Sequence, residues 1–236
     1  MDSAHVKPAE NGIDLHSVEE QEVIQMSDKK TALSRQAETI MKNLEKRNME
    51  GHYFETASAC TEAILAAIPS GSIIGWGGSE SLKECGLLEA IHGGSYELLD
   101  RSAAKTPEEA RQIYGRTVLA DYFLMSSNAI TLDGELINID GNGNRVACLI
   151  QGPSNVIIVA GMNKIVPDVK SGIGRIKNTA CPANAIRLGR NLPCAATGVC
   201  LDCLSPECFC CQVVVTRRSM HPGRIKVYLV GEELGY

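Results

Sequence analysis

Apolar positions near the start of the chain recur at a helical period. Between Val18 and Met49 they fall at roughly helical spacing among many charges, which predicts a long helix lying against the body of the protein. A partner-binding helix is the alternative interpretation. Residues 1–17 are polar and are expected to form a flexible tail, so we divide the chain into a tail (1–17), a helical segment (18–50) and a domain (51–236).

Beyond residue 50, short apolar runs alternate with helical patterns. Helices are predicted at Thr56–Ile68, Ser81–His92, 106–119 and Asp168–Ile186, and strands at Ser72–Ile74, Ser95–Leu99, Ala120–Met125, Val156–Ala160, Val213–Thr216 and Ile225–Val230. Thr106-Pro107 marks a helix start, because threonine caps helices and proline suits the first helical position. This alternation predicts an α/β fold in which helices cover both faces of a mostly parallel sheet.

A hairpin interrupts the alternation. Asp133-Gly134 separates two short apolar runs, which is a strong signal for a tight turn between antiparallel strands. The hairpin follows the predicted strand 120–125, so Asn128 and Thr131 are expected near the carboxyl end of the sheet, where open α/β folds bind ligands. Asp133 is a candidate general base, and a turn aspartate without chemistry is an equally open interpretation.

Three more segments are candidate contacts for an anion. Gly77, Gly78 and Ser79 lie between a predicted strand and a helix, where backbone N–H groups face a negative charge. A merely tight turn is the alternative.

Asn144 and Arg145 close a polar glycine loop, and a guanidinium can hold a carboxylate or phosphate through two parallel hydrogen bonds. Lys164 follows the buried strand 156–160 and is expected at the same edge, as a binding or catalytic side chain.

Composition limits the possible functions. The chain has 236 residues, is 44% apolar and has no apolar run long enough to cross a bilayer, which predicts a folded protein outside the membrane. Its 23 basic against 28 acidic residues give a net charge of −5, which argues against a nucleic-acid binder. The first residues lack the apolar core of a secretory signal, so we expect a cytoplasmic protein.

Cysteines are concentrated late in the chain. Seven of the ten fall between residues 181 and 211, and in a chain with an ample core this distribution indicates a metal or redox role rather than a disulfide framework. Cys200 and Cys203 have the usual spacing of two thiolates on one metal, and Cys194 lies a short loop upstream.

The fourth ligand is left open among Cys208, Cys210 and Cys211. Four thiolates without a local histidine suit an iron–sulfur cluster or a structural zinc ion. A single Cys-x-x-Cys pair favours a four-iron cluster, with zinc and metal-free thiols as alternatives.

These motifs together resemble the lactate-utilisation (LUD) domain family over residues from about 30 to the end. The resemblance is carried, in chain order, by Gly75-Trp76-Gly77-Gly78-Ser79, Ser127-Asn128-Ala129-Ile130-Thr131-Leu132-Asp133-Gly134-Glu135, Gly143-Asn144-Arg145-Val146, Asn163-Lys164-Ile165-Val166, Pro193-Cys194, Cys200-Leu201-Asp202-Cys203 and Val230-Gly231-Glu232-Glu233-Leu234-Gly235.

The resemblance implies a fold related to ribose-5-phosphate isomerase, glucosamine-6-phosphate deaminase and coenzyme A transferases. Relatives such as lactate utilisation protein C act with iron–sulfur partner proteins in oxidising L-lactate to pyruvate. The cysteine-rich end is similar to a subgroup whose matching cysteines would be Cys194, Cys200, Cys203 and Cys210. The extra Cys208 and Cys211 leave the last of these ambiguous.

We therefore expect an iron–sulfur protein that binds a small anionic metabolite and takes part in lactate oxidation or related 2-hydroxy or 2-oxo acid metabolism. One alternative is a cofactor-free isomerase or transferase with Asp133 as base and a structural metal. Another is an accessory subunit that docks to an iron–sulfur oxidoreductase through the N-terminal helix. Whether the isolated chain is an enzyme, and whether it forms a homo-oligomer, stays open.

Overall fold

Six parallel strands form the central sheet. Its order is β1 (Glu50–Phe54), β10 (Ile225–Val230), β7 (Asn155–Gly161), β4 (Tyr122–Met125), β2 (Ile73–Trp76) and β3 (Glu97–Leu99). In β7, Val156 and Ile158 pack into one hydrophobic cluster, whereas Ile157 and Val159 pack into the other. A strand buried on both faces must be apolar throughout, which explains this run in the sequence.

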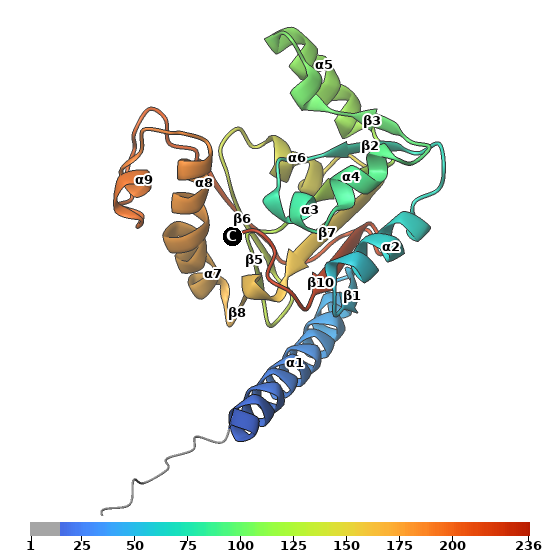
Figure 1. Ribbon diagram of the computed structural model, residues 1–236. Coiled ribbons are helices and arrows are strands. Elements are labelled where there is room, and N and C mark those ends of the chain that lie inside the picture. The colour runs from blue at the N-terminus through green and yellow to red at the C-terminus, as the bar shows by residue number, and fades with distance from the viewer. Residues whose placement is uncertain (1–14) are drawn as a thin grey trace, which may run out of the picture.

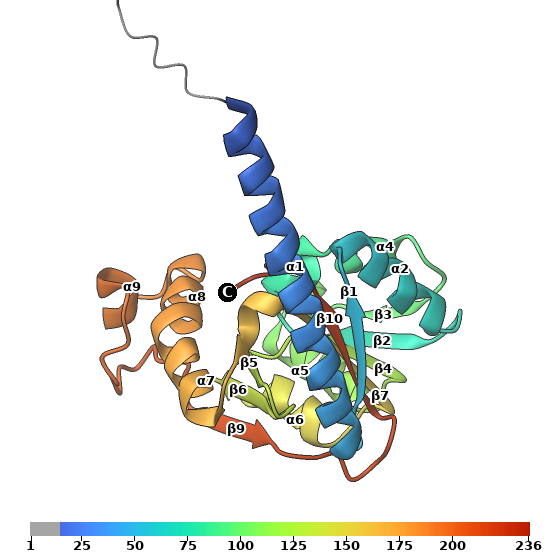
Figure 2. The same cartoon turned by 90° about the horizontal axis from the view of Figure 1, so that it is seen from below.

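Helices cover both faces of this sheet, as the sequence predicts. On one face lie α1 (Leu15–Lys46), α5 (Pro107–Val118) and α6 (Asn144–Ile150), and on the other lie α2 (Ala57–Ala67), α3 (Glu80–Glu84) and α4 (Leu87–His92). Figures 1 and 2 show α1 in blue, with its N-terminal half projecting beyond the body. Ala37, Ile40 and Leu44 are fully buried at helical spacing, so the second half of α1 belongs to the core.

The computed structural model describes residues 15–236, with side chains from Asp28 onward. The expected tail lies outside the described residues up to residue 14, and α1 begins at Leu15, three residues before the predicted helix. The boundaries after residues 17 and 50 stay predictions, although β1 spans the second of them. Among the described residues, no helix combines the length and apolar character that crossing a membrane requires.

The predicted helix Ser81–His92 is divided in the structure. Gly86 ends α3 and begins α4 with a φ of +77°, a conformation that glycine adopts without steric cost. The predicted helix therefore forms two short helices, of which α3 begins after the glycine turn that follows β2.

The predicted hairpin is confirmed, but it belongs to a second sheet that the sequence pattern did not predict. This sheet has the order β8 (Ile165–Val166), β5 (Ala129–Thr131), β6 (Leu136–Asp140) and β9 (Gln212–Thr216). The pairs β5–β6 and β6–β9 are antiparallel, and β5–β8 is parallel. Residues of β5 and β6 contact both the main core and a further cluster against the late helices.

The late helices form a lobe beside the second sheet, drawn in orange in Figure 1. They are α7 (Val169–Arg175), a π-helical turn (Ile176–Ala180), α8 (Cys181–Arg187) and α9 (Pro193–Thr197). Pro182 lies in the first turn of α8, where its missing N–H breaks no necessary helical hydrogen bond. The predicted helix 168–186 therefore survives its proline, with the π turn as the adjustment.

Candidate functional site

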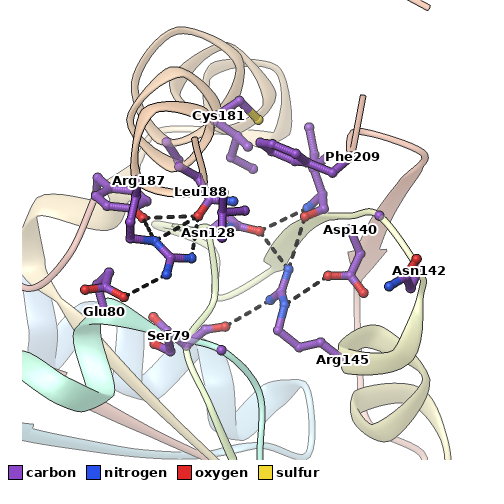
Figure 3. A pocket seen from close by; sticks show the side chains of 18 of the residues that line it. Ser79, Glu80, Asn128, Asp140, Asn142, Arg145, Cys181, Arg187, Leu188 and Phe209 are labelled. Atoms are coloured by element: carbon purple, nitrogen blue, oxygen red, sulfur yellow. Dashed lines mark hydrogen bonds and ion pairs between the residues drawn. The ribbon is translucent and has the colours of Figure 1, made fainter. Parts of the chain in front are cut away.

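A cavity of about 850 Å³ lies between the central sheet and the lobe of late helices. Its polar lining begins where strands end: Ser79 follows β2, and Ser126 and Asn128 follow β4. In Figure 3, Cys181 and Phe209 face Ser79 and Arg145 from the opposite side of the cavity. The carboxyl ends of these strands thus form one wall, as open α/β folds require of a ligand site.

The charged side chains that line the cavity are mainly basic. They comprise Arg101, Arg145, Arg187, Arg190 and Lys164 against Glu80, Asp140 and Glu207. This excess of cations in a partly enclosed space attracts small anions, because a cavity with low-dielectric walls focuses the field of its charges.

Six of the nine predicted binding and catalytic residues line this cavity, namely Gly78, Ser79, Asn128, Asn144, Arg145 and Lys164. Gly77, Thr131 and Asp133 are not among its lining residues. A Cβ on Gly77 would lie 3.2 Å from the Arg145 stem, so this glycine makes room for that side chain. Thr131 is fully buried, and its Oγ1 accepts a 2.9 Å hydrogen bond from the Glu135 backbone N–H.

Asp133, the predicted general base, lies away from the cavity. It is exposed in the β5–β6 turn, where its carbonyl accepts a 2.6 Å hydrogen bond from Arg47 Nε. The turn precedes β6, whereas Asp140, at the other end of that strand, lines the cavity. The hairpin therefore brings its last residues to the site and carries its turn toward α1.

Arg145 organises the cavity wall. Its Nε donates to Asp140 Oδ1 at 3.1 Å, Nη1 to the Ser126 carbonyl and Asn138 Oδ1, and Nη2 to Asn128 Oδ1 and the Ile139 carbonyl. These contacts engage all five N–H donors of the guanidinium. In this arrangement Arg145 contributes positive charge and rigidity, and it has no free pair of donors with which to clamp a ligand.

Ser79 also has a structural partner. Its side chain accepts a 3.3 Å hydrogen bond from the Leu82 backbone N–H and caps α3. Glu80, the first residue of α3, brings a carboxylate to the cavity and pairs with Arg187 Nη1 at 3.2 Å. Gly78 leaves open space, because a Cβ there would meet no atom within 4 Å.

Lys164 is a buried amine on the cavity wall. It ends the short 3₁₀ turn after β7 and is only 4% exposed, and its Nζ donates to Ser81 Oγ at 2.7 Å and to Ser126 Oγ at 3.2 Å. Burial, with the nearby charges of Arg175 and Arg145, lowers the pKa of Lys164 to about 7.

Several lining residues from the end of the chain were not predicted from the sequence. Arg187, at the end of α8, donates from Nε to the Tyr236 hydroxyl at 2.6 Å, and Phe209 precedes β9. A helical pattern predicts that α8 exists, but an arginine at the end of a helix carries no signal of its own. The folded topology alone brings these residues to the cavity.

The late cysteines gather at the same cavity. Cys181, Cys208 and Cys211 line it, and Cys194 packs with Cys203 and Cys208 in a small apolar cluster. In addition, Cys210 donates to Cys181, with 3.4 Å between the two sulfur atoms.

Backbone N–H groups already point at two of these sulfurs. The Asp202 N–H donates to Cys200 Sγ at 3.4 Å, and the Cys210 N–H donates to Cys208 Sγ at 3.5 Å. Asp202 adopts a φ of +53° inside the Cys-x-x-Cys turn. Such N–H···S contacts support thiolate character and are among the factors that tune thiolate-ligated clusters.

The late thiols and Lys177 affect one another electrostatically. Burial and then the neighbouring thiols Cys210, Cys203 and Cys200 raise the pKa of Cys194. Lys177 lies beside Cys200 and Cys210 and supplies a positive charge. Within residues 15–236, however, no three His, Cys, Asp or Glu side chains converge as ligands of a single metal ion.

Comparison with known protein families gives a match to the LUD domain family over residues 37–230. This range includes both sheets and the cysteine-rich segment. The chain belongs to the LUD domain family. The match begins inside α1, at the first residues of the helix that are buried in the core. No curated protein matches this LUD domain protein.

Several solved structures are similar to this LUD domain. A DUF162 family protein from Deinococcus radiodurans is 17% identical, with a TM-score of 0.47, over 86% of this chain and 98% of that one. The eIF2B delta subunit from Chaetomium thermophilum is 17% identical, with a TM-score of 0.34, over 50% of each chain. Ribose 5-phosphate isomerase A from Methanocaldococcus jannaschii is 16% identical, with a TM-score of 0.31, over 48% of this chain and 54% of that one.

Proposed function

We propose that this LUD domain protein is a cytoplasmic iron–sulfur protein that binds a small 2-hydroxy or 2-oxo carboxylate. In this role it takes part in the oxidation of L-lactate to pyruvate or of a related acid. The observation that carries the proposal is the shared wall: the cavity that gathers basic side chains is also lined by Cys181, Cys208 and Cys211. Cys181 lies beside Cys210, and Cys208 packs with Cys194 and Cys203, so a redox centre held by these neighbouring cysteines would lie close to a bound anion.

The donor set fits a cluster of several irons. Cys194, Cys200, Cys203 and Cys210 are the proposed ligands, and each lies near at least one other thiol of the set. A multi-iron cluster spaces its thiolate ligands farther apart than a single ion does, so this looser grouping suits it. When bound, the cluster would supply one-electron transfer; zinc remains the alternative metal.

The cavity suits the carboxylate of the metabolite. Arg145 holds the β6–α6 loop in place, while Arg101 and Arg190 reach the cavity from exposed positions. Arginine binds carboxylates through parallel hydrogen bonds, so these two side chains are the proposed carboxylate contacts. An isomerase that uses Asp133 as its base is not retained, because that carboxylate lies outside the cavity lining.

A redox partner is part of the proposal. Oxidation of a 2-hydroxy acid to a 2-oxo acid releases two electrons and two protons, so a one-electron cluster must pass electrons onward. Val199, Leu201 and Leu204 flank the cysteines, and their side chains are 46%, 59% and 100% exposed. Exposed apolar side chains at this position support docking of an iron–sulfur oxidoreductase subunit. The protein is an enzyme if this chain catalyses the oxidation, and it is an accessory subunit if the partner does.

Anaerobic purification tests the cluster. The expected product is brown, contains iron and acid-labile sulfide, and bleaches on reduction with dithionite. Cys200→Ser/Cys203→Ser is expected to lose iron and colour, whereas Cys148→Ala, which removes a buried thiol away from the cavity lining, is expected to retain both. Colourless wild-type protein with stoichiometric zinc would refute the redox role.

A further inference from the structure

Two buried serines and the chain at Gly235 surround the Lys164 amine at the cavity wall. Ser81, from α3, and Ser126, at the end of β4, hold Nζ, and both serines are themselves buried. The chain at Gly235 passes so close that a Cβ there would lie 2.8 Å from Ser81 Oγ and 3.5 Å from Lys164 Nζ. All four residues of this arrangement line the cavity, namely Ser81, Ser126, Lys164 and Gly235.

The hydrogen bonds around the amine favour its neutral form. A charged ammonium has three N–H donors, and the described residues offer two acceptors, Ser81 Oγ and Ser126 Oγ. The two hydroxyl hydrogens are used elsewhere, since Ser81 donates to the Leu234 carbonyl at 3.1 Å and Ser126 to the Ser127 carbonyl at 3.3 Å. A neutral amine therefore satisfies both of its N–H groups and keeps its lone pair unengaged.

The charges around Lys164 act in the same direction. Burial contributes most to lowering its pKa, Arg175 and Arg145 add repulsion, and Glu84 opposes them more weakly. Arg175 is fixed by hydrogen bonds from its guanidinium to the Asn163 and Asn128 carbonyls at 3.1 and 2.9 Å. Glu84 Oε2 accepts from the Gly235 backbone N–H, so this carboxylate has its own partner. An amine that is desolvated and set beside other cations is a recognised form of activated nucleophile.

We propose that Lys164 is a nucleophile that captures the carbonyl carbon of a 2-oxo acid bound in the cavity, forming an imine. This inference rests on the proposed function for its substrate class. The amine nitrogen forms a bond to C2 while the carbonyl π bond breaks, and a proton passes from nitrogen to the carbonyl oxygen. The resulting carbinolamine then loses water, so amine and 2-oxo acid give imine and water without any oxidant or reductant.

The cavity supplies what this reaction needs. The basic side chains hold the carboxylate next to the carbonyl, and Ser81 and Ser126 fix the amine on the wall. Holding both reactants in place raises their effective concentration and favours addition. A 2-hydroxy acid lacks the carbonyl and cannot form the adduct, so the site distinguishes the two acids covalently.

Reductive trapping with pyruvate tests the proposal. Full-length protein is incubated with pyruvate and cyanoborohydride, and its mass is measured before peptide mapping. One reduced pyruvate adduct at Lys164 is expected, with a trapping rate that rises as pH increases through about 7, because the neutral amine is the reactive form. L-lactate in place of pyruvate is expected to give no adduct.

Matched variants identify the reacting amine. Lys164→Arg is expected to abolish the adduct, whereas Lys170→Arg, an exposed lysine on α7, is expected to retain it. Circular dichroism of Lys164→Arg checks that the variant is folded, and Lys164→Met provides a second variant. Adduct spread over surface lysines, or undiminished in both Lys164 variants, would overturn the proposal.

Calorimetric titration with pyruvate separates this inference from the proposed function. Pyruvate that binds the wild-type protein without forming an adduct overturns the imine and leaves the carboxylate site standing. Absence of both binding and adduct overturns the two together. Binding accompanied by an adduct at Lys164 supports both.

Discussion

Cys181 and Cys210 meet with their sulfur atoms 3.4 Å apart, which joins the start of α8 to the segment that precedes β9. Cys208, two residues earlier, neighbours Cys203 and also accepts from the Cys210 backbone N–H. Cys208 and Cys210 are thus two of the three candidates for the last cluster ligand, and Cys211, whose thiol donates to the Cys208 carbonyl, is the third.

Single substitutions separate these candidates. With Cys210 as the proposed ligand, Cys210→Ser is expected to lose most of its iron, while Cys208→Ser and Cys181→Ala retain it, because a serine oxygen is a poor substitute for a thiolate. The measurements are iron per chain and the electron paramagnetic resonance spectrum of the reduced protein. Iron loss in Cys208→Ser with retention in Cys210→Ser would assign the ligand to Cys208.

Replacing Arg145 is expected to destabilise the protein strongly. Arg145→Met removes five hydrogen bonds and leaves Asp140, whose side chain is 12% exposed, without its ion-pair partner. Loss of one partner from a buried pair costs about 3–5 kcal/mol, so the free energy of unfolding in urea should fall by about that amount.

An exposed ion pair provides the control. Arg116 pairs with Glu97 on the surface, where side chains are 57% and 51% exposed, and Arg116→Met should change stability by about 0–1 kcal/mol. Similar losses in both variants would contradict the organising role of Arg145.

The β5–β6 turn should matter for stability and not for ligand binding. Gly134 has a φ of +83°, and a Cβ there would lie 3.0 Å from the Leu44 backbone nitrogen, so Gly134→Ala should cost roughly 1–2 kcal/mol or more. Asp133→Asn should leave pyruvate binding unchanged, because its side chain is not part of the cavity lining. Calorimetric titration and thermal unfolding check the two expectations, and weakened binding in Asp133→Asn would restore the aspartate to the site.

Lys164 should make stability depend on pH. Its pKa falls from 10.5 to about 7 on folding, mainly through burial. Between these two pH values the unfolded chain keeps a proton that the folded chain has released. The free energy of unfolding therefore increases as the pH rises. Urea unfolding of wild type and Lys164→Met at several pH values should show the difference between them growing in favour of wild type from pH 7 to 10. A constant difference would contradict the lowered pKa.

Local signals in the sequence predicted the elements well. Thr106 caps α5 as expected, with its side chain accepting from the Glu109 N–H, and the apolar run 156–160 is the buried strand β7. Such features depend on neighbours within a few residues, which the sequence displays directly. The division of the hairpin and β9 into a second sheet depends on distant pairing, and no local pattern encodes it.

The candidate site was predictable only in part, for the same reason. Residues directly after β2, β4 and β7, such as Ser79, Asn128 and Lys164, line the cavity because strand ends share an edge. Asp133 is not part of the cavity lining, because the hairpin turn that carries it packs against α1. The donors of Arg145 are engaged by side chains and carbonyls from two segments, 126–128 and 138–140, which spacing alone does not reveal.

The last residues of the chain have a practical consequence for handling the protein. Leu234 and Gly235 are tied to Asn163 and Glu84, and Tyr236 contacts Arg187. Both Tyr236 and Arg187 line the cavity, and the C-terminus lies beside α8 in Figure 1. A polyhistidine tag fused after Tyr236 would start at the cavity, where its imidazoles could compete with the thiols for iron. An affinity tag belongs at the opposite terminus, ahead of α1, if metal content measured on purified protein is to reflect the native thiols.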